Sequence, residues 1–217
     1  MPVSSKKLRS NRAWIERHIN DPYVKRSRAE GYRARSVYKL IGLDEKEHLL
    51  KPGITVVELG SAPGSWTQVV RERLADRTGA VRGRIIAMDI LPMDPVDGVH
   101  FLQGDFREQE VADQLAAILN GDKVDVVLSD MAPNLSGIAA ADAARSLLLN
   151  ELALEFCVEH IAPHGVFVTK CFQGSGHSQF VEALKHTFRK VAARKPAASR
   201  DTSAEVYMVA RELKAPK

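Results

Sequence analysis

From residue 51 onward, short runs of apolar and β-branched residues alternate with longer segments in which apolar side chains recur at helical spacing. Short, almost wholly apolar runs are typical of strands that are buried on both faces, and their alternation with helices is typical of a parallel sheet. We therefore predict an α/β fold of the Rossmann-like, doubly wound type. The predicted strands comprise residues 54–59, 84–89, 99–103, 124–130, 166–170 and 206–210.

Helices are predicted between these strands, at residues 66–74, 110–119, 143–160 and 178–188. In the third of them, a stripe expected to face the sheet consists of Leu148, Leu152, Phe156 and Ile161. A further helix over residues 36–50 precedes the sheet and carries Tyr38 and Lys39 near its start.

The charge of the chain is distributed unevenly. Residues 1–39 hold 11 Lys or Arg against 3 acids, a net of +8, whereas the remaining residues hold 20 against 24, a net of −4. Because 217 residues suit one domain, we predict a basic N-terminal arm at 1–35 and a single domain at 36–217. Such an arm is typical of a protein that neutralises phosphates, although a solvated tail or a presequence has similar composition. The aromatic residues interleaved with these charges, which either stack on bases or anchor the arm, are Trp14, Tyr23, Tyr32 and Tyr38.

Several classes of protein are disfavoured by composition. No apolar run approaches the roughly 20 residues of a membrane span, and no apolar segment follows the basic N-terminus as in a signal peptide. Cys157 and Cys171 are too few for a disulfide framework and lie in no metal-binding motif. We therefore expect a cytoplasmic monomer with two reduced, buried thiols, no bound metal and no association with membranes.

Polar residues gather where the predicted strands end, which is where open α/β sheets bind ligands. Gly60 and Gly64 follow the first strand and allow backbone to approach a ligand closely, but the loop lacks the third glycine of a dinucleotide fingerprint and the lysine of a P-loop. Asp89 ends the second strand, where a carboxylate can accept hydrogen bonds from ribose hydroxyls. Asp105 follows the third strand and can accept one from an adenine amino group.

The segment LSDMAPNLSG at residues 128–137 resembles the signature of the FtsJ-like ribose 2′-O-methyltransferases. Further matches, in family order, are ARSVYKL, VELGSAPGSW, LPMDP, QGDFR, KCFQG and RKPAASRDTSAEVY. The resemblance implies a mostly parallel, seven-stranded sheet, S-adenosyl-L-methionine as cofactor, and membership of the bacterial branch that methylates a uridine in 23S ribosomal RNA of the large subunit. The family's eukaryotic relatives include enzymes that act on transfer RNA, and that substrate stays open.

The same resemblance implies which residues form the site. The family's Lys-Asp-Lys-Glu tetrad matches Lys39, Asp130, Lys170 and Glu205, with Lys170 as general base or as stabiliser of the developing alkoxide. Lys39 is expected to hold the substrate, and Glu205 to orient the lysines. The residues expected to bind the cofactor are Gly60, Gly64, Trp66, Asp89, Asp105 and Asp130.

Small departures and rival chemistries complete this interpretation. Glu58 stands where many relatives have Asp, Ser65 replaces a frequent glycine, and residues 75–83 suggest a longer loop. A pyrimidine C5-methyltransferase needs a cysteine near the fourth strand end, where there is none, and Cys171 is expected on the opposite strand face from Lys170. The Pro-Pro-aromatic loop of amino-group methyltransferases is missing too. A non-catalytic RNA-binding module remains the rival from a different class.

Overall fold

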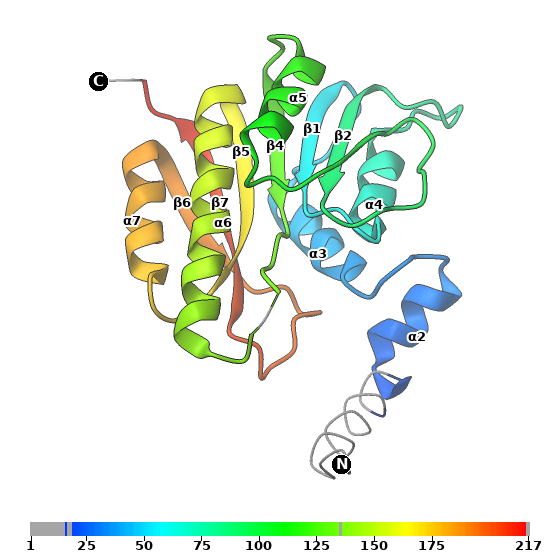
Figure 1. The fold of residues 1–217 in the computed structure, drawn as a ribbon. Coiled ribbons are helices and arrows are strands. Elements are labelled where there is room, and N and C mark those ends of the chain that lie inside the picture. Colours follow the sequence, from blue (N-terminus) through cyan, green and yellow to red (C-terminus); the bar gives the residue numbers. More distant parts are fainter. Residues whose placement is uncertain (1–15, 17–18, 135, 216–217) are drawn as a thin grey trace.

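The computed structural model describes residue 16 and residues 19–134 and 136–215. Seven strands form one sheet in the order β3-β2-β1-β4-β5-β7-β6 (Figure 1). The strands are β1 Ile54–Leu59, β2 Gly83–Asp89, β3 His100–Gln103, β4 Val124–Ser129, β5 Ile161–Phe172, β6 Phe188–Arg194 and β7 Glu205–Leu213. β1 to β5 run parallel, and β7 is antiparallel to both of its neighbours, as in the predicted mostly parallel, doubly wound sheet.

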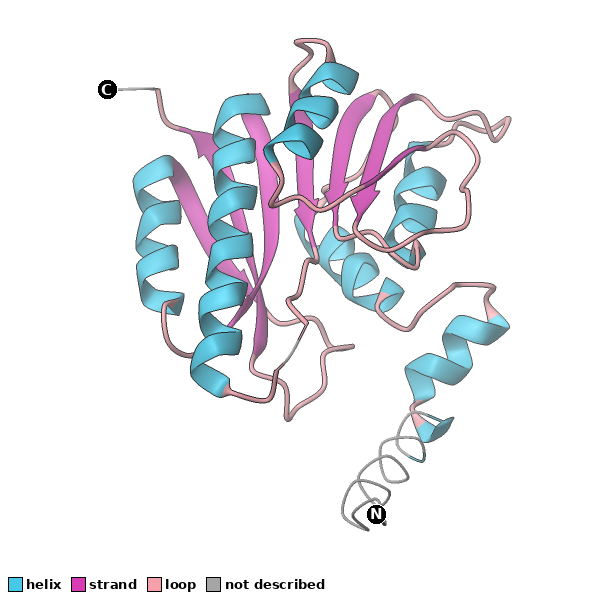
Figure 2. Ribbon diagram, in the orientation of Figure 1, coloured by secondary structure: helices cyan, strands magenta, loops and turns pink. Residues whose placement is uncertain are grey.

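Helices cover both faces of the sheet and enclose two apolar layers (Figure 2). One layer is formed with α5 Gln109–Leu119, α6 Ala139–His160 and α7 His177–Thr187. The other is formed with α3 Val37–Glu47 and α4 Ser65–Leu74. Because each central strand packs against helices on both sides, β1 and β4 are buried along nearly their whole length, which accounts for their apolar sequences.

Two sequence predictions about elements are wrong. The edge strand β6 was not expected, because its sequence FRKVAAR exposes Arg189 and Lys190 and lacks an apolar run; it is held by antiparallel pairing to β7. The inner face predicted for α6 is correct for Phe156 and Ile161, which are buried, and for Leu152, which packs against the core, but it is wrong for Leu148, which is 46% exposed. Leu148 instead lines a cavity at the carboxyl edge of the sheet.

The described part of the N-terminal segment packs against the domain. Helix α2 Pro22–Ala29 begins after Asp21, whose carboxylate accepts a hydrogen bond from the Tyr23 amide. The rings of Tyr23 and Tyr32 lie 5.4 and 6.3 Å from that of the buried Tyr38. These tyrosines therefore serve as anchors; Trp14 lies outside the described residues. Among the helices that the structure describes, none is long and apolar enough to span a membrane.

Candidate active site

The sheet changes its winding direction between β1 and β4, and the loops that follow these two strands meet at the carboxyl edge. A cavity of about 580 Å³ opens there, within the range of small-molecule sites. It is lined by Gly60, Ala62, Met88, Asp89, Ile90, Leu91, Gly104, Asp105, Phe106, Arg107, Asp130, Met131, Ala132, Pro133, Asn134, Arg145, Leu148 and Leu149. Carboxylates and apolar side chains are thus combined in one concave surface.

Gly60 brings the two loops together. Its φ is +82°, and a Cβ built there would lie 2.8 Å from the amide nitrogen of Met131. A larger residue would be strained and would also collide with the loop after β4. The Asp130 amide donates to the Leu59 carbonyl oxygen over 3.0 Å, which fixes the second loop against the first.

Asp89 and Asp105 both line the cavity, and each is already held by neighbouring donors. The two carboxylate oxygens of Asp89 accept hydrogen bonds of 2.8 Å from the amides of Ala62 and Leu91. Asp105 accepts from the Arg107 guanidinium, and this hydrogen bonding lowers the pKa of the Asp105 carboxyl. Both side chains are therefore oriented before any ligand binds, and Asp105 stays ionised at neutral pH.

Two predicted cofactor residues do not line the cavity. Gly64 lies at the start of α4, against Arg33 and Met93. Trp66 is buried: its indole N–H donates to the Ser36 carbonyl oxygen over 2.8 Å, and its ring lies 5.6 Å from that of Tyr207. Trp66 therefore packs in the core beside Tyr207. Its aromatic side chain suggested a contact with the cofactor, but the sequence did not reveal this packing role.

The Lys-Asp-Lys-Glu set is brought together as two ion pairs. Lys170 Nζ lies 3.0 Å from Asp130 Oδ1 and donates to the Asp130 carbonyl oxygen over 2.6 Å. Lys39 Nζ lies 2.7 Å from Glu205 Oε2. All four side chains are mostly shielded from solvent, so these are not the surface ion pairs that contribute little. Of these four residues, Asp130 lines the cavity, so the Lys170–Asp130 ion pair lies at the cavity wall.

Tyr207 lies between the two ion pairs. It is the register partner of Lys170 in the antiparallel β5–β7 ladder, and it follows Glu205 by two residues, so the three side chains share one face of the sheet. Its hydroxyl donates to Asp130 Oδ1 over 2.8 Å, and its ring centroid lies 5.8 Å from Lys39 Nζ. Burial raises the pKa of the Tyr207 hydroxyl well above its usual value, which keeps it a donor.

Sequence reasoning did not assign a role to Tyr207 or to Ser199, although both lie within the last matched motif. The Ser199 hydroxyl donates to Glu205 Oε1 over 3.1 Å. The alternation of side chains along a strand was the available signal for Tyr207, because it places that ring on the face of Glu205.

Glu58 lies beneath the loop after β1 and is 1% exposed. Its Oε2 accepts a hydrogen bond of 2.7 Å from the Thr67 hydroxyl, while Oε1 has no hydrogen-bond partner among the described residues. Burial raises the pKa of the Glu58 carboxyl, the hydrogen bond from Thr67 lowers it, and the negative charges of Asp130 and Asp89 raise it, which together bring the pKa to about 8. At neutral pH the side chain is therefore largely protonated.

Thiol chemistry is disfavoured by geometry. Cys171 points away from Lys170, as predicted, and its Sγ lies 3.6 Å from the Asn150 side-chain nitrogen on α6. Burial raises the pKa of this thiol to about 12, so it is not a nucleophile at neutral pH. Cys157 is likewise free and buried.

Comparison with known proteins identifies the family. The model of the family described as FtsJ-like methyltransferase matches residues 32–213. Ribosomal RNA large subunit methyltransferase E of Burkholderia mallei (strain SAVP1) is 54% identical over 97% of this chain and 99% of its own length, as is the protein of that name from Burkholderia pseudomallei (strain K96243).

Two solved structures share the architecture. A ribosomal RNA methyltransferase from Plasmodium falciparum is 32% identical, with a TM-score of 0.74 over 84% of this chain and 98% of that one. Human methyltransferase-like protein 13 in complex with SAH is 17% identical, with a TM-score of 0.54 over 81% and 79% of the two chains, and supports the fold alone. The resemblance predicted from the motifs is confirmed, and the chain belongs to the FtsJ-like methyltransferase family, with S-adenosylmethionine as its cofactor.

Proposed function

We propose that this protein methylates the 2′-hydroxyl of a ribose, that of a uridine, in 23S ribosomal RNA of the large ribosomal subunit. The observation that carries the proposal is the position of Asp130, which lines the cavity and is also bound to Lys170 and Tyr207. A cofactor in the cavity and a ribose beside Lys170 would therefore meet at one carboxylate.

The cavity residues fit S-adenosylmethionine, which supplies an electrophilic methyl group on a sulfonium sulfur. Asp89 is placed to accept from the ribose hydroxyls, and Asp105 to accept from the adenine amino group. The apolar Ile90, Leu91 and Leu148 are exposed at the cavity and offer surface for the adenine ring. Gly60 keeps the backbone clear between these groups, because a side chain there would fill the junction of the two loops.

The tetrad would position the attacking hydroxyl and handle its proton. Lys170 is 7% exposed and is held at two points by Asp130, so its ammonium has a defined direction. Lys170 either stabilises the developing alkoxide with its positive charge or accepts the proton as a general base. Lys39 binds the ribose or a phosphate, while Glu205 holds Lys39 in place over 2.7 Å. Positioning of this kind supplies roughly 7 to 11 kcal/mol of the barrier reduction.

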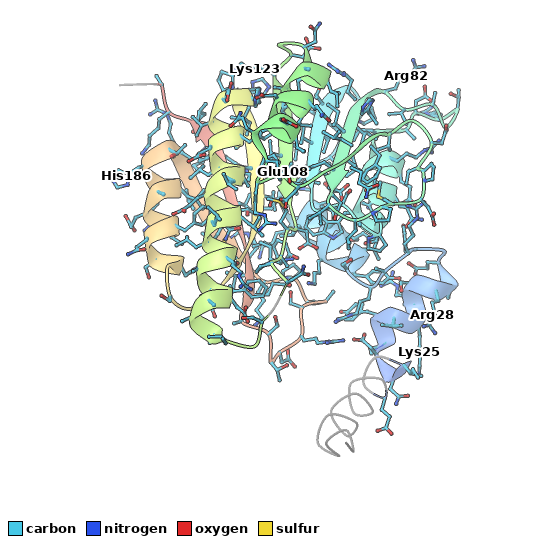
Figure 3. The ribbon with its side chains drawn as sticks, in the orientation of Figure 1. Lys25, Arg28, Arg82, Glu108, Lys123 and His186 are labelled. Carbon is cyan, nitrogen blue, oxygen red and sulfur yellow. The ribbon has the colours of Figure 1, made fainter. Side chains whose placement is uncertain are left out.

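The proposed substrate rests on the relatives and on charge. The Burkholderia proteins are named for methylation of large-subunit ribosomal RNA and match nearly the whole chain. Figure 3 shows Lys25 and Arg28 projecting from α2, and both are exposed to solvent. We place these cations in a basic arm, residues 1–35, that neutralises RNA phosphates beside a single catalytic domain, residues 36–217. The protein would act as a monomer in the cytoplasm, where ribosomes assemble.

Mapping of 2′-O-methylation across ribosomal and transfer RNA, in cells with and without this protein, tests the proposal. The expected result is the loss of one uridine methylation in 23S RNA and its restoration by the wild-type chain. Loss of a transfer RNA methylation alone would assign the other substrate. RNA and cofactor binding without any methyl transfer would make the protein the non-catalytic RNA-binding module that composition also permits.

A further inference from the structure

Arg33 holds two loops at the cofactor site. Its guanidinium donates to the carbonyl oxygens of Pro63, Asp94 and Pro95 over 3.1, 2.8 and 2.9 Å. Pro63 belongs to the loop after β1, and the other two carbonyls belong to the loop after β2. Both loops contribute to the cavity at nearby positions, Ala62 in the first and Leu91 in the second.

The backbone around Arg33 is also hydrogen-bonded to the region of the cofactor loop. Its amide donates to Gln68 Oε1 over 3.0 Å, and the Gln68 side-chain nitrogen donates back to the Gly31 carbonyl oxygen over 3.1 Å. Gln68 lies on α4, immediately after the cofactor loop. The segment that precedes α3 is therefore attached to this loop and to the helix that follows it.

Gly64 leaves room for the Arg33 guanidinium beside the loop. A Cβ at this position would lie 2.4 Å from Arg33 Nη1 and 2.8 Å from Met93 Sδ, and the φ of Gly64 is +100°. The positive φ favours glycine here, and a side chain would also displace the ends of the Arg33 and Met93 side chains.

The charge of Arg33 is directed at the loops. Within residues 19–134 and 136–215, no carboxylate forms an ion pair with it, and both terminal nitrogens donate to carbonyl oxygens. Guanidinium groups suit such planar, multiple recognition because their donors lie in a rigid fork. This arginine therefore differs from Arg28, which is exposed on α2 and forms no side-chain hydrogen bond among the described residues.

We propose that Arg33 is a positioning residue for the amino-acid end of the cofactor, an inference that rests on the proposed function. Asp89 holds the loop from inside the cavity through the Ala62 amide, and Arg33 holds it from outside through the Pro63 carbonyl. With the ribose at Asp89 and the adenine at Asp105, Gly60 and Ala62 are the residues of this loop that line the cavity and remain for the methionine portion.

Calorimetric titration with two ligands tests this role. S-adenosylhomocysteine carries the amino-acid portion, and methylthioadenosine lacks it. Arg33→Ala should weaken binding of S-adenosylhomocysteine by about tenfold or more, because bonds from a charged donor are lost, and leave methylthioadenosine binding unchanged. Arg33→Lys, which can reach fewer carbonyls at once, should give a smaller loss for the first ligand only. Arg77→Ala, which removes an exposed arginine without a side-chain hydrogen bond among the described residues, is the matched control and should change neither affinity.

The other possible results of these titrations would overturn either the inference or the proposed function. Equal weakening of both ligands by Arg33→Ala and Arg33→Lys would overturn the inference in favour of a general structural role. Unchanged affinity for both, with weaker RNA binding, would make Arg33 an RNA contact and would also overturn it. Failure of the wild-type protein to bind either ligand would contradict the proposed function itself, which this comparison thereby separates from the role of Arg33.

Discussion

Tyr207 and Asp130 are 77 residues apart in the chain and are joined by a 2.8 Å hydrogen bond from the phenolic hydroxyl to Oδ1. The same oxygen lies 3.0 Å from Lys170 Nζ. Asp130 is therefore oriented by a neutral donor and a cation at once, and each of its partners comes from a different strand. The position of the Lys170 ammonium depends on this carboxylate, and the carboxylate depends on Tyr207.

Tyr207→Phe should slow methyl transfer while leaving cofactor affinity nearly unchanged. The variant keeps the buried ring but removes a hydrogen bond to a charged group, which contributes about 1.5 to 3 kcal/mol. If that energy is expressed in the transition state, the single-turnover rate falls by about tenfold or more. Tyr23→Phe is the control, because its hydroxyl forms no hydrogen bond among the described residues. An unaltered rate would show that Lys170 alone orients Asp130.

Lys170→Ala should retain the fold and bind the cofactor but lose at least roughly 100-fold in single-turnover rate if Lys170 is a general base. Lys185→Ala removes a lysine on the surface of α7 whose one ion-pair partner in the described part of the chain is Glu182, and it should have the wild-type rate. Rates near wild type for Lys170→Ala would mean that Asp130 or water receives the proton.

Asp89→Ala should weaken cofactor binding by about tenfold or more, as expected for loss of hydrogen bonds to a carboxylate. Part of this loss would come from the loop, because Asp89 also accepts from the amides of Ala62 and Leu91. Asp89→Asn keeps one acceptor oxygen, so its cofactor affinity should lie between those of the wild-type protein and Asp89→Ala. Calorimetric titration with S-adenosylhomocysteine measures all three proteins, and equal affinities would exclude Asp89 as the ribose ligand.

The buried Glu58 should make the protein less stable as pH rises. Its folded-state pKa of about 8 exceeds the unfolded value of 4.5, so the folded state binds more protons between these limits. The free energy of unfolding then decreases from about pH 4.5 to about pH 8. Glu58→Gln should remove this slope, and the two proteins should diverge by about 3 to 5 kcal/mol across the window. Urea unfolding at pH 5, 6.5 and 8 measures it; parallel pH profiles would contradict the assignment.

Replacing Lys25 and Arg28 by Gln should weaken RNA binding and reduce its salt dependence without changing cofactor affinity. Each lost phosphate contact lowers the slope of log K against log salt by roughly 0.7 to 0.9. Lys123→Gln with Lys185→Gln removes the same charge and serves as the control, because Lys123 lies far from α2 (Figure 3) and Lys185 belongs to α7. If both double variants bind RNA alike, the arm is only a solvated segment, and basic residues such as Arg189 and Lys195 become the candidate surface.

The sequence alone was sufficient for the central strands and for the position of Asp89 and Asp105 at the cavity. β1 and β4 are buried on both faces, so their apolar runs are local signals that survive without tertiary information. Asp89 and Asp105 end or follow such strands, and the winding of a parallel sheet brings those ends to one edge. The family motifs added the tetrad. Each motif marks one member of the set, even though the members lie far apart in the chain.

The tertiary structure decided what depends on contacts between distant segments. Tyr207 reaches Asp130 across 77 residues, and Arg33 reaches Pro63 and Asp94 across 30 and 61. Neither pairing leaves a periodic signal, because a side chain's partner is set by the packing of strands and loops and not by its neighbours in sequence. β6 was missed for a related reason: an edge strand with Arg and Lys on its surface is stabilised by pairing with β7, and that pairing exists only once the sheet has formed.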